Sequence, residues 1–193
     1  IALVAGARDA PGIVIIAGTG SIAYGRNANG EAARAGGWGH MVGDEGSAFW
    51  IGRETLAAVM RAADGRGPST RLTADVLAHF DISDVSRLPR IVYDREAPRV
   101  SVGALGPIVQ QAAAQGDAVA VHILDRAARE LVLAAQAAAN GLKPSQLPAA
   151  DSCSIALPMH RRHISRPPSA CGDIDLHLLG EGTHERLAHK LGA

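Results

Sequence analysis

The chain has 193 residues, 47% of them hydrophobic, and its 19 basic residues balance its 19 acidic ones. A domain of this size buries roughly two-thirds of the surface of its unfolded chain, so it can build a core without disulfides. The balanced charge excludes the basic field that nucleic acid or an anionic membrane surface requires, and small metabolites are the expected ligands.

The cysteine content and the first residues predict a cytoplasmic protein. Cys153 and Cys171 are the two cysteines and are not closely spaced, which predicts reduced thiols and no zinc site. The apolar stretch 1–16 is interrupted by Arg8, Asp9 and Pro11 and is too short to cross a bilayer, so no secretion signal or membrane anchor is expected.

Three short strands are predicted first along the chain. Residues 12–17 are an apolar run rich in β-branched side chains, which is typical of a strand buried on both faces. After a glycine turn, residues 21–26 are predicted as a second strand. Residues 27–30 read Asn-Ala-Asn-Gly and tolerate positive φ, so residues 31–35 are expected to return as a third, antiparallel strand.

An amphipathic helix is predicted to begin near Ser47, because apolar residues recur every three or four positions up to residue 63. Asp44 and Glu45 precede it, where the positive end of the helix dipole favours carboxylates. A weaker pattern predicts a short helix at 72–80, with Pro89 and Pro98 bounding loops.

Two further helices follow, at residues 105–113 and 119–138. Gly116 is expected to end the first, and Asp117 is expected to cap the second. The alanine-rich face of the second helix is either core or the face of a homodimer. We expect residues 1–150 to form one domain and residues 151–193, which hold five of the eight histidines, to form an atypical tail with one strand at 154–157 and one helix at 183–191.

Two glycine-rich segments are the candidate functional loops. The first is Gly18-Thr19-Gly20-Ser21, and the second, residues 36–47, reads Gly-Gly-Trp-Gly-His-Met-Val-Gly-Asp-Glu-Gly-Ser. Glycine has no Cβ, so main-chain N–H groups can approach phosphate or hydroxyl oxygens closely. The first segment fits the dinucleotide pattern G-x-G-x-x-A, but no helix follows it directly. A hairpin loop that holds phosphate is therefore favoured over a dinucleotide site or a plain strand connection.

Two side chains of the second segment, Trp38 and Asp44, have two interpretations each. Trp38 either stacks on a sugar ring or packs in the core, whereas Trp50 is assigned to the core. Asp44 either accepts hydrogen bonds from two sugar hydroxyls or caps the following helix, and the glycines around it favour the ligand. Glu45 and His40 are expected to orient the loop.

Together, the two segments resemble the BadF/BadG/BcrA/BcrD-type ATPases and, within them, the N-acetylglucosamine kinases, most densely over residues 12–60. The resemblance implies an α/β fold of the actin-like (ribonuclease H-like) type, with a mixed sheet, an antiparallel hairpin and flanking helices. It further implies the C-terminal half of a two-domain sugar kinase. In that family ATP and Mg²⁺ bind between the domains, and the γ-phosphate of ATP passes to a hydroxyl of an amino sugar.

Site residues follow from the resemblance by position. It assigns nucleotide binding to Gly18, Thr19, Gly20 and, near the adenine, Ala113. It assigns sugar binding to Ser21, Gly37, Trp38, Gly39 and Asp44. Ile22 stands where kinases of the animal type carry Asn, which favours bacterial amino-sugar relatives.

Three features of the family are expected outside this chain or altered in it. The catalytic Asp and the first phosphate loop are expected upstream of Ile1, so the N-terminal domain of the parent protein is the expected partner and the fragment alone is expected to be inactive. The Gly-Gly turn that helps hold adenosine is replaced near residues 152–160, and our hypothesis is that the tail arises from a shifted reading frame.

Two alternative functions belong to other classes. One is an activator-type ATPase of a dehydratase or reductase, which would need Cys153 and Cys171 to hold an iron–sulfur cluster across a dimer. The other is a non-catalytic sugar-binding module.

Overall fold

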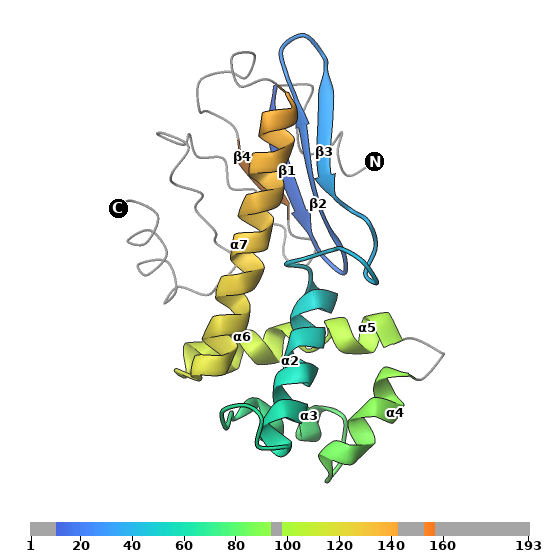
Figure 1. The fold of residues 1–193 in the computed structure, drawn as a ribbon, viewed down its shortest axis with the longest axis vertical. Helices are drawn as coiled ribbons and strands as arrows, with labels where there is room; N and C mark the ends of the chain where they lie inside the picture. Colours follow the sequence, from blue (N-terminus) through green and yellow to red (C-terminus); the bar gives the residue numbers. More distant parts are fainter. Residues whose placement is uncertain (1–10, 94–97, 143–152, 157–193) are drawn as a thin grey trace.

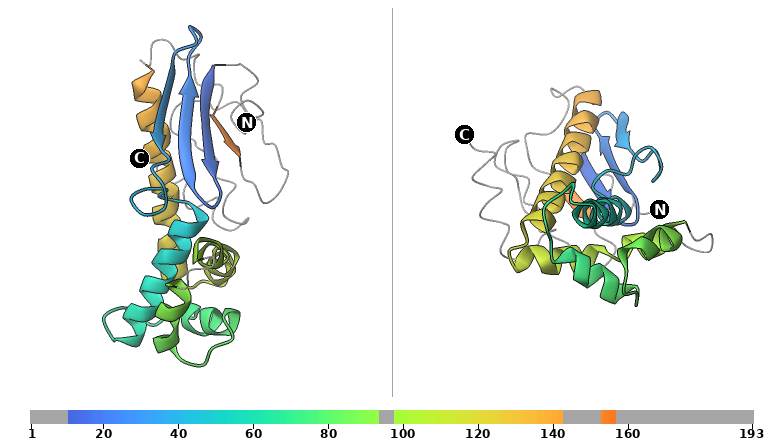
Figure 2. Two further views of the ribbon diagram at one scale, coloured as in Figure 1. Left: turned by 90° about the vertical axis from the view of Figure 1, so that its right-hand side faces the viewer. Right: turned by 60° about the horizontal axis from the view of Figure 1, so that its bottom comes forward.

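The computed structural model describes residues 11–93, 98–142 and 153–156. A β-sheet occupies one end of the molecule and a group of helices the other, as Figure 1 shows. One long helix, α7 (Ala118–Gly141), runs from the helical group along the sheet, and both views of Figure 2 agree with this arrangement.

The sheet has four strands in the order β3-β2-β1-β4: β1 (Gly12–Ala17), β2 (Ser21–Arg26), β3 (Ala32–Gly36) and β4 (Cys153–Ala156). β2 is antiparallel to both β1 and β3, so the predicted hairpins are confirmed, with the third strand shifted by one residue. Gly30 has φ +83° in the turn between β2 and β3, as the Asn-Gly pattern predicts. Val14 and Ile15 lie on opposite faces of β1 and are both buried, as expected for this apolar run.

β4 lies beyond the predicted domain boundary at residue 150, yet it belongs to the sheet. It runs parallel to β1, with Ile13 opposite Cys153 and Ile16 opposite Ala156. The strand predicted at 154–157 is therefore confirmed with a shift of one residue, and residues 153–156 are part of the same fold as residues 12–36. The helix predicted at 183–191 lies outside the described residues.

The helices are α2 (Ala48–Ala63), α3 (Leu72–His79), α4 (Leu88–Val92), α5 (Pro98–Gly103), α6 (Gly106–Ala114) and α7, with a 3₁₀ turn, η1, at Val85–Arg87. The predicted helices are confirmed to within three residues at each end. The interpretation of Pro89 as a loop boundary is wrong, because it lies in the first turn of α4, whereas Pro98 is the first residue of α5 and does mark the boundary of an element. A first-turn residue has no intrahelical use for its N–H, so proline is tolerated there.

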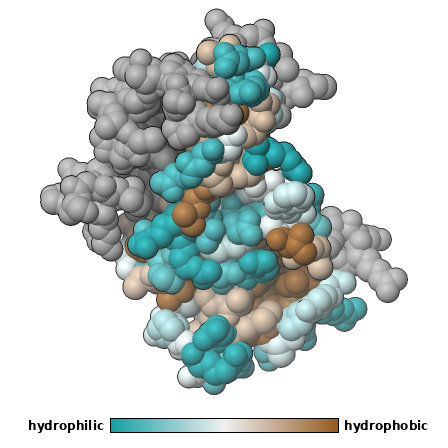
Figure 3. All heavy atoms as spheres, turned by 45° about the horizontal axis from the view of Figure 1, so that its top comes forward, coloured by the Kyte–Doolittle hydropathy of each residue, from teal (hydrophilic) through white to brown (hydrophobic). Residues whose placement is uncertain are grey.

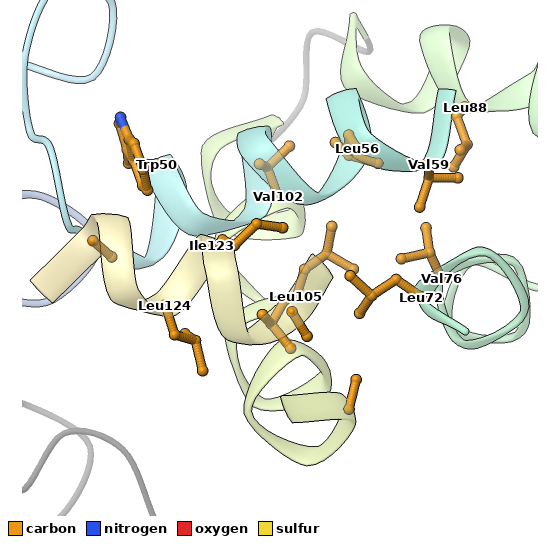
Figure 4. Close-up of a cluster of buried hydrophobic side chains, with 14 residues drawn as sticks. Trp50, Leu56, Val59, Leu72, Val76, Leu88, Val102, Leu105, Ile123 and Leu124 are labelled. Carbon is orange, nitrogen blue, oxygen red and sulfur yellow. The ribbon is translucent and has the colours of Figure 1, made fainter. Parts of the chain in front are cut away.

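Two clusters of buried side chains form the core. The helical cluster joins α2 to α3, α4, α5, α6 and the first half of α7, and Figure 4 shows Val59 of α2 and Val76 of α3 pointing toward each other within it. The sheet cluster joins Ile15, Ala17 and Ala23 to Leu131, Ala135 and Ala138 of α7. The alanine-rich face of α7 is thus core, because small side chains let the helix approach the sheet closely.

The surface is mixed in polarity. On the face drawn in Figure 3, hydrophilic residues run across the middle and hydrophobic residues occur in small separate patches. No helix within the described residues is both long enough and apolar enough to cross a membrane.

Asp117 holds two helices together, and its loss should destabilise the fold. Its Oδ1 accepts the N–H of Ala120 at 2.9 Å and caps α7, while its Oδ2 accepts Thr70 Oγ1 at 2.8 Å and the N–H of Arg71 at 2.9 Å beside α3. Partial burial acts to raise the pKa of Asp117, but the hydrogen bonds from Ala120, Arg71 and Thr70 outweigh it and lower the pKa below 3.8.

We expect Asp117→Ala to lower the free energy of unfolding by about 1–2 kcal/mol at pH 7, as measured by urea denaturation. A lowered pKa stabilises the fold at pH values above the ordinary carboxyl pKa, and the contribution is lost as the pH falls through the folded-state value. The difference between wild type and variant should therefore narrow below about pH 4. Asp125→Asn, which removes an exposed pair with Arg129, is the control and should change stability by less than about 0.5 kcal/mol. A loss of that small size for Asp117→Ala as well would contradict the assignment.

Candidate functional site

The first glycine-rich segment forms a tight turn between β1 and β2. The N–H of Gly18 donates to the carbonyl of Gly20 at 2.8 Å, and Ala17 pairs with Ser21 at the base of the turn. Thr19 lies at the tip and is exposed. The hairpin predicted for this segment, rather than a strand-to-helix turn, is therefore what the structure contains.

The second segment leaves β3 and reverses direction before α2 begins. The carbonyl of Gly39 accepts the N–H of Gly43 at 2.8 Å, and Gly39 has φ +88°, which a residue with a Cβ rarely adopts. Asp44 has φ +56°, a left-handed conformation that Asp tolerates better than most residues. Ser47 then caps α2, since its Oγ accepts the N–H of Trp50 at 3.2 Å.

Hydrogen bonds join the two segments into one site. The N–H of Ala48 donates to the carbonyl of Gly18 at 2.8 Å, and Ser21 Oγ donates to the carbonyl of Glu45 at 2.6 Å. Between the segments is an open depression of about 480 Å³, lined by Ile16, Gly18, Thr19, Gly20, Ser21, Ile22, Gly37, Gly39, Asp44 and Arg99.

Asp44 is the buried carboxylate of this depression. Its side chain is 6% exposed, its Oδ1 accepts the N–H of Gly39 at 3.3 Å, and its Oδ2 lies 3.5 Å from a guanidinium nitrogen of Arg99. It does not cap α2, because Ser47 does. The interpretation of Asp44 as a helix cap is therefore wrong, and its carboxylate is directed at the loop and the depression.

Gly20 allows this placement of Asp44. A Cβ at Gly20 would lie 2.6 Å from Asp44 Oδ2 and 3.0 Å from Arg99. Gly37 is confined in the same way, because its Cβ would lie 2.8 Å from Ile22 Cδ1. Both glycines let the two segments approach each other, in addition to exposing main chain.

Arg99 is a lining residue that the sequence analysis does not identify. It lies in the first turn of α5, 55 residues from Asp44, and α5 packs against α2. Gly52 of α2 makes this packing possible, because a Cβ there would lie 1.9 Å from the carbonyl oxygen of Val102. The nearest signal in the sequence is a glycine within an otherwise regular helix, which often marks a close approach of another backbone.

The aromatic residues in and beside the second segment differ in how far they are exposed. Trp50 is buried in the helical cluster, which confirms its assignment to the core. Trp38 is 66% exposed and stacks under the guanidinium of Arg34, whose Cζ lies 4.5 Å from the ring centroid, so its core interpretation is wrong. His40 packs edge-on against Phe49, with ring centroids 4.9 Å apart.

Most of the predicted site residues come together, and two lie outside the lining. Gly18, Thr19, Gly20, Ser21, Gly37, Gly39 and Asp44 all line the depression. Trp38 lies on the same segment but is not among the lining residues. Ala113 is on α6, where it packs against the helical cluster, so its proximity to an adenine stays a prediction. Ser21 is buried, with its hydroxyl donated to the loop.

In chemical terms the depression offers main chain at two glycine turns, one carboxylate and one guanidinium. Such a set suits a ligand that combines hydroxyl donors with anionic groups. Within residues 11–93, 98–142 and 153–156, no group of three or more His, Cys, Asp or Glu side chains is placed to hold a metal ion.

Comparison with known proteins gives the same family along most of the chain. The profile of the BadF/BadG/BcrA/BcrD ATPase family matches residues 1–146. The N-acetylmuramic acid/N-acetylglucosamine kinase of Clostridium acetobutylicum is 41% identical over 137 residues, which are 71% of this chain and 45% of that protein. The N-acetyl-D-glucosamine kinase of Dictyostelium discoideum is 38% identical over 121 residues, 62% of this chain and 38% of that protein.

A solved structure shares the fold. A candidate N-acetylglucosamine kinase from Chromobacterium violaceum superposes with a TM-score of 0.63 at 30% identity, over 80% of this chain and 50% of that one. The chain thus spans half or less of the length of each of these relatives.

The close contact between α2 and α5 can be tested by substitution. We expect Gly52→Ala to lower the free energy of unfolding by about 1–3 kcal/mol or more, because the added methyl group overlaps the Val102 carbonyl and must push α5 away. Gly106→Ala is the control, since a Cβ there meets nothing within 4 Å and its φ is not positive. Urea denaturation of both variants measures the difference, and equal stabilities would argue against the packing that positions Arg99.

Proposed function

The chain belongs to the BadF/BadG/BcrA/BcrD ATPase family, and on that premise we propose that it is the part of an ATP-dependent amino-sugar kinase that receives both the phosphate end of ATP and the sugar. The observation that carries the proposal is the shared depression, in which a glycine turn after β1 and a second glycine-rich loop face each other. Two hydrogen bonds, from Ala48 and Ser21, hold the loops in this position.

Asp44 is the proposed sugar-binding residue. It is nearly buried, yet among the described residues the one polar partner of its Oδ2 is Arg99, at a long 3.5 Å, so this oxygen can accept hydrogen bonds from sugar hydroxyls. Gly39 fixes the carboxylate through Oδ1. Trp38 lies on the same loop outside the lining, with Arg34 over its ring, and its 66% exposure leaves ring surface on which the C–H face of a sugar can stack. Relatives named as kinases of N-acetylglucosamine and N-acetylmuramic acid make amino sugars the proposed substrate class.

The turn at 18–20 is the proposed site for the phosphates of ATP. Phosphoryl transfer depends mainly on positioning and on neutralising charge, which main-chain N–H groups and a threonine hydroxyl can assist. Asp44 is the one carboxylate among the described residues that line the depression and contacts Gly39 and Arg99, so we assign it to binding. We place the carboxylate that accepts the hydroxyl proton in a part of the parent protein outside this chain.

Mg²⁺ is proposed to arrive with the nucleotide. It prefers to keep water ligands and binds through one or two carboxylates together with the phosphates of the substrate. The described residues do not form a dedicated site for it, since Asp44 already contacts a guanidinium.

The alternatives from the sequence analysis have less support. An iron–sulfur activator would use Cys153, which lies in β4, and Cys171, which lies outside the described residues. The relatives from Clostridium acetobutylicum and Dictyostelium discoideum are both named as sugar kinases.

Asp44→Asn tests the sugar site. The substitution keeps the shape of the side chain and removes the charge, so we expect N-acetylglucosamine to bind about tenfold or more weakly, the size expected when hydrogen bonds to a charged acceptor are lost. Titration of ¹⁵N-labelled protein followed by NMR detects such weak binding. Asp75→Asn, at a surface pair with Arg71 in α3, is the matched control and should bind as the wild type does. Unchanged affinity in Asp44→Asn would remove Asp44 from the site.

The 193-residue chain alone is expected to form no sugar phosphate above background when incubated with radiolabelled ATP, Mg²⁺ and N-acetylglucosamine. The reason is that the proposed proton acceptor is not among the residues that line the depression. Normal turnover by the chain would show that the catalytic carboxylate is within it.

Thr19→Ala should weaken nucleotide binding several-fold and leave sugar binding unchanged, because Thr19 is at the tip of the phosphate turn.

A further inference from the structure

The charge balance of the depression shows a feature that the proposed sugar site does not need for a neutral substrate. Among the lining residues in the described part of the chain, Asp44 and Arg99 are the two with charged side chains, and they are 55 residues apart in the sequence. A neutral amino sugar requires hydroxyl acceptors such as Asp44. It gives no reason for a cation at the same place.

Arg99 is available to a ligand. Its side chain is 45% exposed, whereas Asp44 beside it is 6% exposed. Their contact is 3.5 Å long, well beyond the 2.7–2.9 Å of a strong charge-assisted hydrogen bond. The guanidinium has five N–H donors in a planar fork that matches a carboxylate, and its one long contact with the described part of the chain leaves most of those donors unused.

The position of Arg99 also fits recognition of a substituent on the sugar. Both Asp44 Oδ2 and the Arg99 guanidinium lie directly beside Gly20, so the carboxylate and the cation face the same point between the two loops. A sugar whose hydroxyl is bound by Asp44 would present a neighbouring substituent to Arg99. Without the cation, an acidic sugar would meet an uncompensated Asp44 and be repelled.

We propose that Arg99 is a specificity-determining residue that lets this site accept amino sugars bearing a carboxylate as well as neutral ones. The proposal rests on the proposed function and assigns the choice within its substrate class. N-acetylmuramic acid is such an acidic sugar, because its lactyl ether carries a carboxylate, and N-acetylglucosamine is the matched neutral one. Arg99 pairs with the substrate carboxylate while Asp44 keeps its hydroxyl contacts.

NMR titration of the 193-residue chain with each of the two sugars tests the proposal. In the wild type both sugars should bind. Arg99→Gln should weaken N-acetylmuramic acid about tenfold or more, as expected for one lost charge-assisted hydrogen bond, and N-acetylglucosamine less than about threefold. Arg99→Lys keeps the charge without the planar fork, so its affinity for N-acetylmuramic acid should lie between those of the wild type and Arg99→Gln. Arg53→Gln is the matched control, since Arg53 is 47% exposed and also pairs with a carboxylate, Glu54, away from the depression.

The outcomes separate this proposal from the one on which it rests. Equal losses for both sugars in Arg99→Gln, or no loss for either, would overturn the specificity role and leave the kinase proposal standing. If the wild type binds N-acetylglucosamine but not N-acetylmuramic acid, the specificity role is likewise overturned and the kinase proposal still stands. Weaker ATP binding in Arg99→Gln with unchanged sugar affinities would overturn it in favour of a phosphate contact. If the wild type binds neither sugar, both proposals fail.

Discussion

The site depends on two hydrogen bonds between the turn that joins β1 to β2 and the loop that leads from β3 to α2. Gly18 accepts the first N–H of α2 through its carbonyl, and Ser21 donates its hydroxyl to the main chain of Glu45. Both bonds are accepted by main-chain carbonyls, so the carboxylate of Asp44 and the guanidinium of Arg99 are not used to fix the positions of the loops. Gly20 and Gly37 leave room for the side chains of Asp44 and Ile22, which a Cβ at either position would displace. The chemistry proposed for the depression requires this geometry.

Much of the fold could be predicted because its signals are local. The β-branched run of β1, the Asn-Gly turn before β3 and the Asp117 cap of α7 each act through neighbouring residues, and all three are present in the structure. The two loops of the candidate site were predicted for a similar reason: several glycines between a strand and a helix have few uses other than exposing or approaching main chain. The assignment of individual residues to ligands came from the family resemblance, and seven of those nine residues line the depression.

The remainder could not be predicted because it depends on contacts between distant segments. Arg99 reaches Asp44 only because α5 packs on α2 at Gly52, and no pattern near residue 99 encodes that contact. Exposure of Trp38 is decided by the path of the whole loop, so its sequence context fits core and surface equally. Pro89 of α4 shows a related difficulty, since proline disrupts a helix interior and yet suits a first turn.

α7 connects the two clusters of buried side chains, because one continuous helix contributes residues to both. This helix has 24 residues without a break. Its first half contributes Ile123 and Leu124 to the helical cluster, and its second half contributes Leu131 and Ala138 to the sheet cluster. Disorder in one cluster would release the half of α7 that packs there, and because the helix is continuous the other half would lose the support of its neighbouring turns. We therefore expect the sheet and the helices to unfold as one cooperative unit.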